Sequence, residues 1–164
     1  MKINPNNIHD VDQSHYIVVL NKQIQLISQL DSLPDREMRA LIRHCMHAIG
    51  NLFLDYFQTH LQVAQKQGEL NREILSQAAL FIQQDYVADL EHFLQGAFEG
   101  YGEWQLACQQ RTNIEAFNEI FGGVVDVLDT QEIDEYIQQR KNVEGIDQSE
   151  VPQNMPKSHW WWYV

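Results

Sequence analysis

The segment Asp31-Ser32-Leu33-Pro34-Asp35-Arg36-Glu37 decides the fold class of this chain. A capping residue, a proline in the first turn and acidic side chains at the positive end of the helix dipole are typical of a helix start. Apolar side chains then recur at helical spacing, at Met38, Leu41, Ile42, Cys45, Met46 and Ile49. The sequence therefore predicts a helix, which either breaks at Gly50 or runs on through Leu61 to a glycine cap at Gly68.

Similar stripes predict helices on both sides of this one. We expect Ser14 to cap a first helix, whose apolar side carries Ile17, Leu20, Ile24, Ile27 and Leu30. Asn71 opens the longest helix, which ends at Gly96. Its predicted core side consists of Leu75, Ala78, Ala79, Ile82, Tyr86, Leu90, Phe93 and Leu94.

Two segments with the spacing of a capping box predict helix starts nearer the C-terminus. Thr112-Asn113-Ile114-Glu115 follows a short predicted helix over 103–111 and opens another that ends at Gly122-Gly123. Asp129-Thr130-Gln131-Glu132 opens the last. Together these patterns predict an all-α, single-domain bundle of six or seven helices over residues 1–142.

The remaining residues, 143–164, have no helical period and end in Trp160-Trp161-Trp162-Tyr163-Val164. Three consecutive tryptophans cannot share one side of a helix, and each aromatic ring can bury 150–250 Å². We therefore expect an extended, Trp-rich strap that docks on the bundle. Its exposed part could also contact a partner, because tryptophan is enriched at interface hot spots.

The charge of the chain is concentrated in one half. The net charge is −12, yet residues 1–68 are neutral, whereas residues 69–150 hold seventeen acidic and four basic side chains. Such acidity argues against nucleic acid and anionic membranes as direct partners, since both require clustered lysine and arginine. It permits a basic protein partner, although a solvated acidic surface without any partner would have the same composition.

The sequence gives no sign of export or of a membrane span. The first residues lack an apolar signal region, no apolar stretch approaches about 18 residues, and the two cysteines, Cys45 and Cys108, both fall in apolar helical patterns. We expect two buried thiols and a cytoplasmic protein.

Two histidine patterns have spacings that can occur in metal sites. His44 and His47 lie three residues apart with His60 beyond them, and Asp89 with His92 has the carboxylate–histidine spacing of di-metal bundles. The second pattern recurs only at Asp12 and His15, in the N-terminal lead-in and not in the middle of a predicted helix. Both patterns lack ligands for a complete site, and neither a nucleophile motif nor a phosphate loop is present. We expect no cofactor, no metal, no catalytic residue and no enzyme activity.

The acidic residues between positions 85 and 135 are the remaining functional signal. Some of these carboxylates are explained by the helix dipole, but their number is not. A field of this kind accelerates capture of a cationic protein and gives specificity through charge pairing. The predicted partner-binding residues are Asp85, Asp89, Glu99, Glu103, Asp126, Asp129, Glu132, Asp134 and Glu135.

A small, acidic, helical chain that ends in Pro156-Lys157-Ser158-His159-Trp160-Trp161-Trp162 resembles the immunity proteins of bacterial contact-dependent growth inhibition and related polymorphic toxin systems. The resemblance implies a non-enzymatic inhibitor of one cognate toxin domain. Such toxins are often basic nucleases, whose clefts the immunity protein blocks with acidic groups. The alternatives are a helical adaptor or regulatory domain that binds a basic or apolar peptide, and a metal-dependent bundle enzyme.

Overall fold

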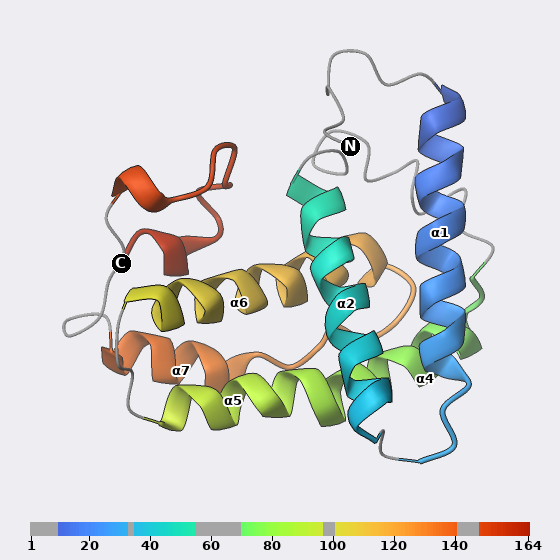
Figure 1. The fold of residues 1–164 in the computed structure, drawn as a ribbon, viewed down its shortest axis with the longest axis horizontal. Coiled ribbons are helices and arrows are strands. Elements are labelled where there is room, and N and C mark those ends of the chain that lie inside the picture. The colour runs from blue at the N-terminus through green and yellow to red at the C-terminus, as the bar shows by residue number, and fades with distance from the viewer. Residues whose placement is uncertain (1–9, 33–34, 55–69, 97–100, 141–147) are drawn as a thin grey trace.

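The computed structural model describes residues 10–32, 35–54, 70–96, 101–140 and 148–164 (Figure 1). Within these ranges no strand occurs, which confirms the predicted all-α class. The helices form five rods: α1 (Asp10–Ser28), α2 (Arg36–Leu52), the continuous run of α4 (Arg72–Phe81), η2 (Ile82–Val87) and α5 (Ala88–Gln95), α6 (Tyr101–Phe121), and α7 (Gln131–Arg140). Two short 3₁₀ turns follow, η3 (Gln148–Glu150) and η4 (Trp160–Trp162).

The rods pack in two groups around one apolar core. Figure 1 shows α5, α6 and α7 stacked in one direction, while α2 runs steeply across one end of this stack and α1 stands beyond it, against α4. The closest pairings are α2 with α6 and α1 with α4, and the run α4–η2–α5 passes under both groups. Every rod contributes fully buried side chains to a single cluster, among them Ile24, Ile49, Leu90, Phe117 and Ile137.

The predicted start at Asn71 is confirmed by its cap, whereas the start predicted within 31–37 lies later than expected, because α2 begins at Arg36, after Pro34, with Asp35 as its cap. The Asp35 carboxylate accepts a hydrogen bond from the backbone N–H of Met38, and the Asn71 side chain accepts one from that of Ile74. The prediction for Ser14 is wrong, because α1 already begins at Asp10 and Ser14 lies inside it. The proposed continuation through Leu61 to Gly68 lies outside the described residues.

The long helix after Asn71 is interrupted by a π turn rather than being regular throughout. Its buried positions Ile82, Tyr86, Leu90 and Leu94 are four residues apart, and each step overshoots the 3.6 residues of an α-helical turn. A π turn uses an extra residue and absorbs that overshoot, so the same side of the rod faces the core at both ends. Asp85, Tyr86 and Val87 are buried together in this turn.

The predicted division of the next helix at Thr112 is wrong. One helix of 21 residues, α6, spans Tyr101–Phe121 and ends at the predicted glycine pair. Thr112 and Glu115 have the spacing of a capping box, but Thr112 and Asn113 are buried in the middle of α6, where their side chains bond to other segments. The start at Asp129 is confirmed, since α7 begins at Gln131, whose N–H donates to the Asp129 carboxylate.

The helices α2 and α6 cross at Gly50, which does not break α2. A Cβ atom on Gly50 would lie 1.8 Å from Asn113 Oδ1 and 3.3 Å from Asn113 Cα. The Asn113 side chain cannot swing away without loss, because it donates to Tyr86 Oη and accepts from Gln109 Nε2. The missing side chain therefore permits the contact between the two helices.

Gly50→Ala is expected to lower the free energy of unfolding by about 1–3 kcal/mol, the usual cost of overpacking a core. Chemical denaturation followed by circular dichroism measures it. Gly102→Ala is the matched control, because Gly102 is also helical but a Cβ there meets nothing within 4 Å. That variant should gain up to about 1 kcal/mol from helix propensity. Equal stability of the two variants would show that α2 and α6 leave room for a methyl group between Gly50 and Asn113.

Residues 148–164 contact the bundle mainly through α6. The predicted extended strap is not confirmed: the chain forms the short turns η3 and η4, joined by irregular backbone. Trp161 and Trp162 are buried, whereas Trp160 is half-buried. The division of the chain at residue 142 stays a prediction. Of the helices in the described ranges, none has both the length and the apolarity needed to cross a membrane.

Candidate functional site

Three of the predicted partner-binding carboxylates are paired with arginines of the same chain. Asp85 lies 3.3 Å from Arg39 Nε, and Asp89 lies 3.2 Å from Arg43 Nη2. Asp134 receives two hydrogen bonds from one guanidinium, that of Arg111. These three acidic groups therefore serve contacts within the fold.

Asp85 is the most enclosed of them. Only 8% of its side chain is exposed, and its Oδ2 atom has no hydrogen-bond partner in the described structure. Burial raises the pKa of this carboxyl group, and the nearby charges of Arg39 and Arg43 oppose that shift. A buried carboxylate of the π turn cannot form the surface of an interface.

Four of the predicted residues do share one exposed stretch. Asp126 and Asp129 lie in the turn between α6 and α7, and Glu132 and Glu135 lie on the first turns of α7. We refer to these four residues as the α7 acidic segment. Within the described residues, no lysine or arginine forms an ion pair with any of them.

Amide side chains hold this segment in place. Asn118 accepts a hydrogen bond from the Leu128 N–H at 2.6 Å and donates to the Leu128 carbonyl. Gln83, from the π turn, makes the same pair of bonds to the backbone of Asp129. The turn is therefore fixed at two consecutive residues, which positions the carboxylates before any partner arrives.

Glu91 on α5 adds a fifth carboxylate beside the segment. Partial burial is the main cause that raises the pKa of Glu91, and the negative charges of Glu132 and Asp129 raise it further. Mutual repulsion of this kind requires the groups to be close in space. The sequence prediction omitted Glu91, because the sequence of α5 does not show that this residue lies close to α7.

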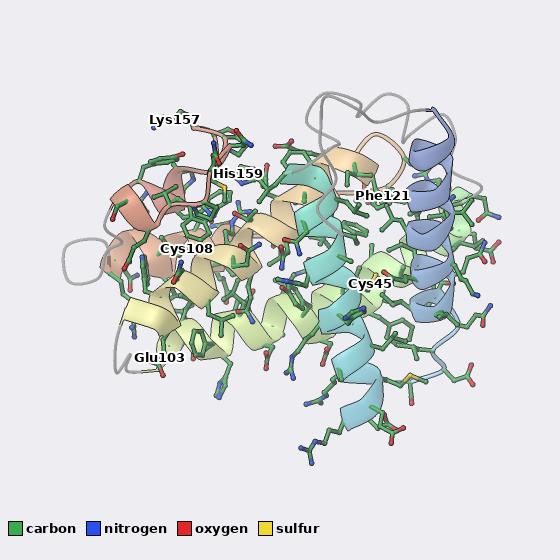
Figure 2. All side chains as sticks on the ribbon, turned by 45° about the horizontal axis from the view of Figure 1, so that its top comes forward. Cys45, Glu103, Cys108, Phe121, Lys157 and His159 are labelled. Carbon is green, nitrogen blue, oxygen red and sulfur yellow. The ribbon has the colours of Figure 1, made fainter. Side chains whose placement is uncertain are left out.

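The other two predicted residues do not join the segment. Glu99 lies outside the described residues. Glu103 lies in the first turn of α6, and α6 runs about 27 Å from there to its end, where the acidic segment starts. Figure 2 shows Glu103 and Phe121 at opposite ends of this helix.

A buried polar cluster on α6 was not foreseen from the sequence. Arg111, only 4% exposed, bonds to Asp134 on α7 and to Glu115 one turn along α6, and its guanidinium carbon lies 4.1 Å from the centre of the Trp161 ring. One cation thus joins α6, α7 and the 3₁₀ turn η4. The only sequence signal was an isolated arginine in an acidic half of the chain.

Thr112, the next residue, accepts hydrogen bonds from two indoles. Trp161 Nε1 lies 3.0 Å from the Thr112 hydroxyl oxygen, and Trp162 Nε1 lies 2.8 Å from it. Both lone pairs of the hydroxyl are then occupied, so its proton is free for His159 Nδ1 at 3.2 Å or the sulfur of Met155 at 3.8 Å. A single buried hydroxyl therefore ties down both buried tryptophans.

His159 completes this polar cluster. Its ring is fully buried and stacks between Phe53, the residue that caps the C-terminus of α2, with 5.8 Å between ring centroids, and Trp161, with 4.8 Å. Its Nε2 atom lies 3.9 Å from the Glu119 carboxylate, beyond hydrogen-bonding distance. Residues of α2, α6 and the final segment therefore meet at one imidazole.

Both cysteines are free and buried, as predicted. Burial raises the pKa of Cys45 and of Cys108 to about 12, so neither thiol has the lowered pKa of a reactive cysteine. Cys108 Sγ lies 3.5 Å from the carbonyl oxygen of Trp161. Figure 2 shows Cys108 on α6, near the segment that carries His159, and Cys45 on α2.

The histidine patterns do not assemble into a metal site in the described part of the chain. His44, His47 and His92 are exposed, and Asp89 is paired with Arg43. No three histidine, cysteine or acidic side chains described here come close enough to hold an ion. His60 lies outside the described residues, and Asp12 and His15 fall within α1.

Comparison of the chain with known protein families, with curated proteins and with solved structures finds no match. No relative therefore supplies site residues that could be transferred to this chain. Its functional surfaces are inferred from the exposed carboxylates and the buried contacts described above.

Proposed function

We propose that this protein is a non-enzymatic bacterial immunity protein, acting in the cytoplasm, that binds and neutralises a cognate toxin domain. The toxin is a basic nuclease, and the carboxylates cover its active-site cleft. One observation supports this proposal above the others: the α7 acidic segment is exposed, has no ion pairs within the described structure, and is held rigidly by Asn118 and Gln83.

The charges of this segment suit the capture of a cationic surface. The carboxylates of Glu91, Asp129 and Glu132 repel one another, so an approaching arginine or lysine stabilises them. The same field steers the partner and speeds association at low salt. The arginine-paired residues Asp85, Asp89 and Asp134 have no such free charge, so we place the interface at the α7 acidic segment with Glu91.

The triple variant Asp129→Lys, Glu132→Lys, Glu135→Lys is expected to slow association with the toxin domain by about 10–100-fold and to abolish protection of RNA or DNA from cleavage. The probe is the toxin domain encoded beside this gene, and surface plasmon resonance at several salt concentrations measures the association rate. Loss of the salt dependence in the variant is part of the expected result.

A matched control carries the same change in net charge elsewhere. Asp31, Glu37 and Glu73 are exposed and lie away from α7: Asp31 follows the end of α1, Glu37 is in the first turn of α2, and Glu73 is in the first turn of α4. Their triple reversal to lysine should leave the association rate within about threefold of the original. Equal binding by both triple variants would place the interface away from the α7 acidic segment.

A further inference from the structure

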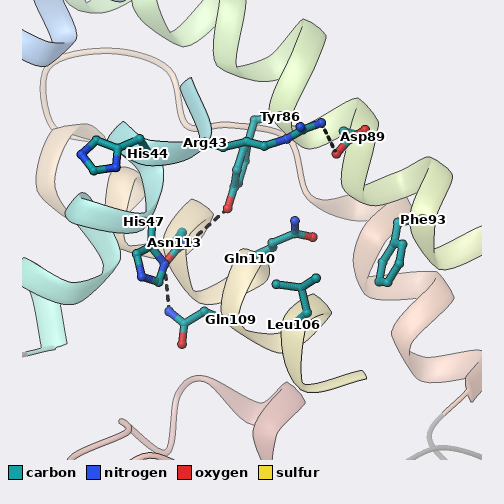
Figure 3. A pocket seen from close by; sticks show the side chains of 10 residues that line it. All are labelled: Arg43, His44, His47, Tyr86, Asp89, Phe93, Leu106, Gln109, Gln110 and Asn113. Carbon is teal, nitrogen blue, oxygen red and sulfur yellow. Dashed lines mark hydrogen bonds and ion pairs between the residues drawn. The ribbon is translucent and has the colours of Figure 1, made fainter. Parts of the chain in front are cut away.

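A pocket of about 580 Å³ opens between α2, α5 and α6, away from the α7 acidic segment (Figure 3). Its volume falls in the range of small-molecule sites in proteins. Arg43, His44 and His47 of α2 form one side, Asp89 and Phe93 of α5 another, and residues of α6 the rest. Three helices therefore converge on one concave surface, which the proposed toxin interface does not include.

The π turn shapes this pocket by placing Tyr86 in its wall. Single π turns inside α-helices occur frequently at functional sites. The Tyr86 hydroxyl accepts a hydrogen bond from Asn113 Nδ2 at 3.1 Å, which leaves its own proton to donate. Burial raises the pKa of Tyr86 to about 12, so the hydroxyl keeps that proton at neutral pH.

Gln110, on α6, provides an acceptor that lacks a donor. Its Oε1 atom is shielded from solvent and makes no hydrogen bond. An unsatisfied amide oxygen is unfavourable, and the terminal torsion of glutamine turns easily. A ligand N–H entering beside Phe93 and Leu106 could therefore gain this oxygen as a partner. In Figure 3 the Gln110 amide is seen between the rings of Tyr86 and Phe93.

The charges around the pocket cancel. Arg43 and Asp89 line it together and are paired at 3.2 Å, so neither offers an uncompensated charge to a ligand. The aromatic and apolar side chains of Tyr86, Phe93 and Leu106 favour a flat, apolar body. The pocket thus combines a neutral, partly aromatic lining with one hydroxyl donor and one amide acceptor.

We propose that this pocket binds a small, neutral, planar ligand, namely an aromatic or heteroaromatic ring that carries a carboxamide or an equivalent pair of N–H donor and acceptor. Tyr86 donates to the acceptor of the ligand, and Gln110 receives its N–H. The ring lies against Phe93 and Leu106. This site is independent of the toxin interface, because it uses the side of α5 that carries Asp89 and Phe93, not Glu91.

The test compares three minimal probes on the full chain by NMR titration: benzamide, benzoate and toluene. At about pH 8, benzamide should bind at least about fivefold more tightly than either of the others. Benzoate has the same shape with a charge, and toluene has the ring without the amide. Equal binding of benzoate or toluene, or no binding of benzamide at millimolar concentration, would overturn the proposal.

Three variants locate the binding. Leu106→Trp should fill the pocket and remove benzamide binding, while the control Leu80→Trp, at a leucine of α4 with similar exposure (48% against 51%), should not. Gln110→Met, which keeps the shape but removes the acceptor, should weaken benzamide about fivefold and leave toluene unchanged. Benzamide binding that survives Leu106→Trp at full affinity would place the ligand elsewhere and refute the assignment.

Discussion

Thr112→Val is expected to lower the free energy of unfolding by about 2–5 kcal/mol, although valine has nearly the same shape as threonine. The hydroxyl oxygen of Thr112 is the acceptor for the indole N–H groups of Trp161 and Trp162. Each buried donor left without an acceptor costs about 1–3 kcal/mol. Neither indole can turn to water, because both residues are at most 2% exposed.

Thr112→Ser is the matched control, since serine keeps the hydroxyl and loses only a methyl group. It should remain within about 1.5 kcal/mol of the original protein. Urea denaturation followed by circular dichroism measures both variants. A valine variant as stable as the serine variant would show that the two indoles do not depend on this oxygen.

The second large effect is expected at Arg111. Arg111→Met should lower the free energy of unfolding by about 3 kcal/mol, because it leaves the carboxylates of Asp134 and Glu115 side by side without their cation. We expect the lower end of the range for broken buried pairs, since these carboxylates are 30% and 29% exposed and stay partly hydrated. The contact with the Trp161 ring is lost as well.

An exposed pair provides the control for this variant. Arg43 and Asp89 are 49% and 44% exposed, so Arg43→Met should cost at most about 1 kcal/mol. A double-mutant cycle then isolates the buried pair: Asp134→Asn should cost much less when Arg111 is already methionine. Additive effects of the two substitutions would mean that Arg111 and Asp134 do not stabilise the fold through each other.

The helices were predictable where a signal lies within a few residues. Asn71 caps its helix through a side-chain bond to the third residue onward, a pattern that needs no tertiary information. The start within 31–37 was predicted a few residues early, because the observed cap is Asp35, which follows Pro34. The apolar stripes likewise predicted the buried sides, with Ile42, Met46 and Ile49 in the core. Local sequence therefore gave the class of fold and most helix positions.

The errors arose where one local pattern has two physical outcomes. Thr112 can cap a helix or stand inside one, and only the indoles of Trp161 and Trp162, about 50 residues away, decide between these outcomes. The π turn is similar, since apolar residues four apart fit a drifting α-helix as well as a π turn. Tertiary contacts resolved both, and the sequence alone contains no measure of them.

For the candidate site, the sequence located the charge but not its pairing. The excess of acid in residues 69–150 could be counted. Which carboxylates are neutralised inside the fold depends on where Arg39, Arg43 and Arg111 point, and that follows from how α2 and α7 pack against their neighbours. Glu91 was missed for the same reason, because only packing brings it close to Glu132.

The alkylation rates of the two buried thiols can report how often two parts of this molecule open. With a pKa of about 12 and no access to solvent, each reacts with an alkylating reagent only while the structure around it is open. Cys108 contacts the backbone of Trp161, so its alkylation rate measures how often the final segment detaches from α6. Cys45 lies on the buried side of α2, so its alkylation rate reports how often the core opens along that helix. Pulsed alkylation with mass spectrometry can thus follow two openings in one unmodified chain.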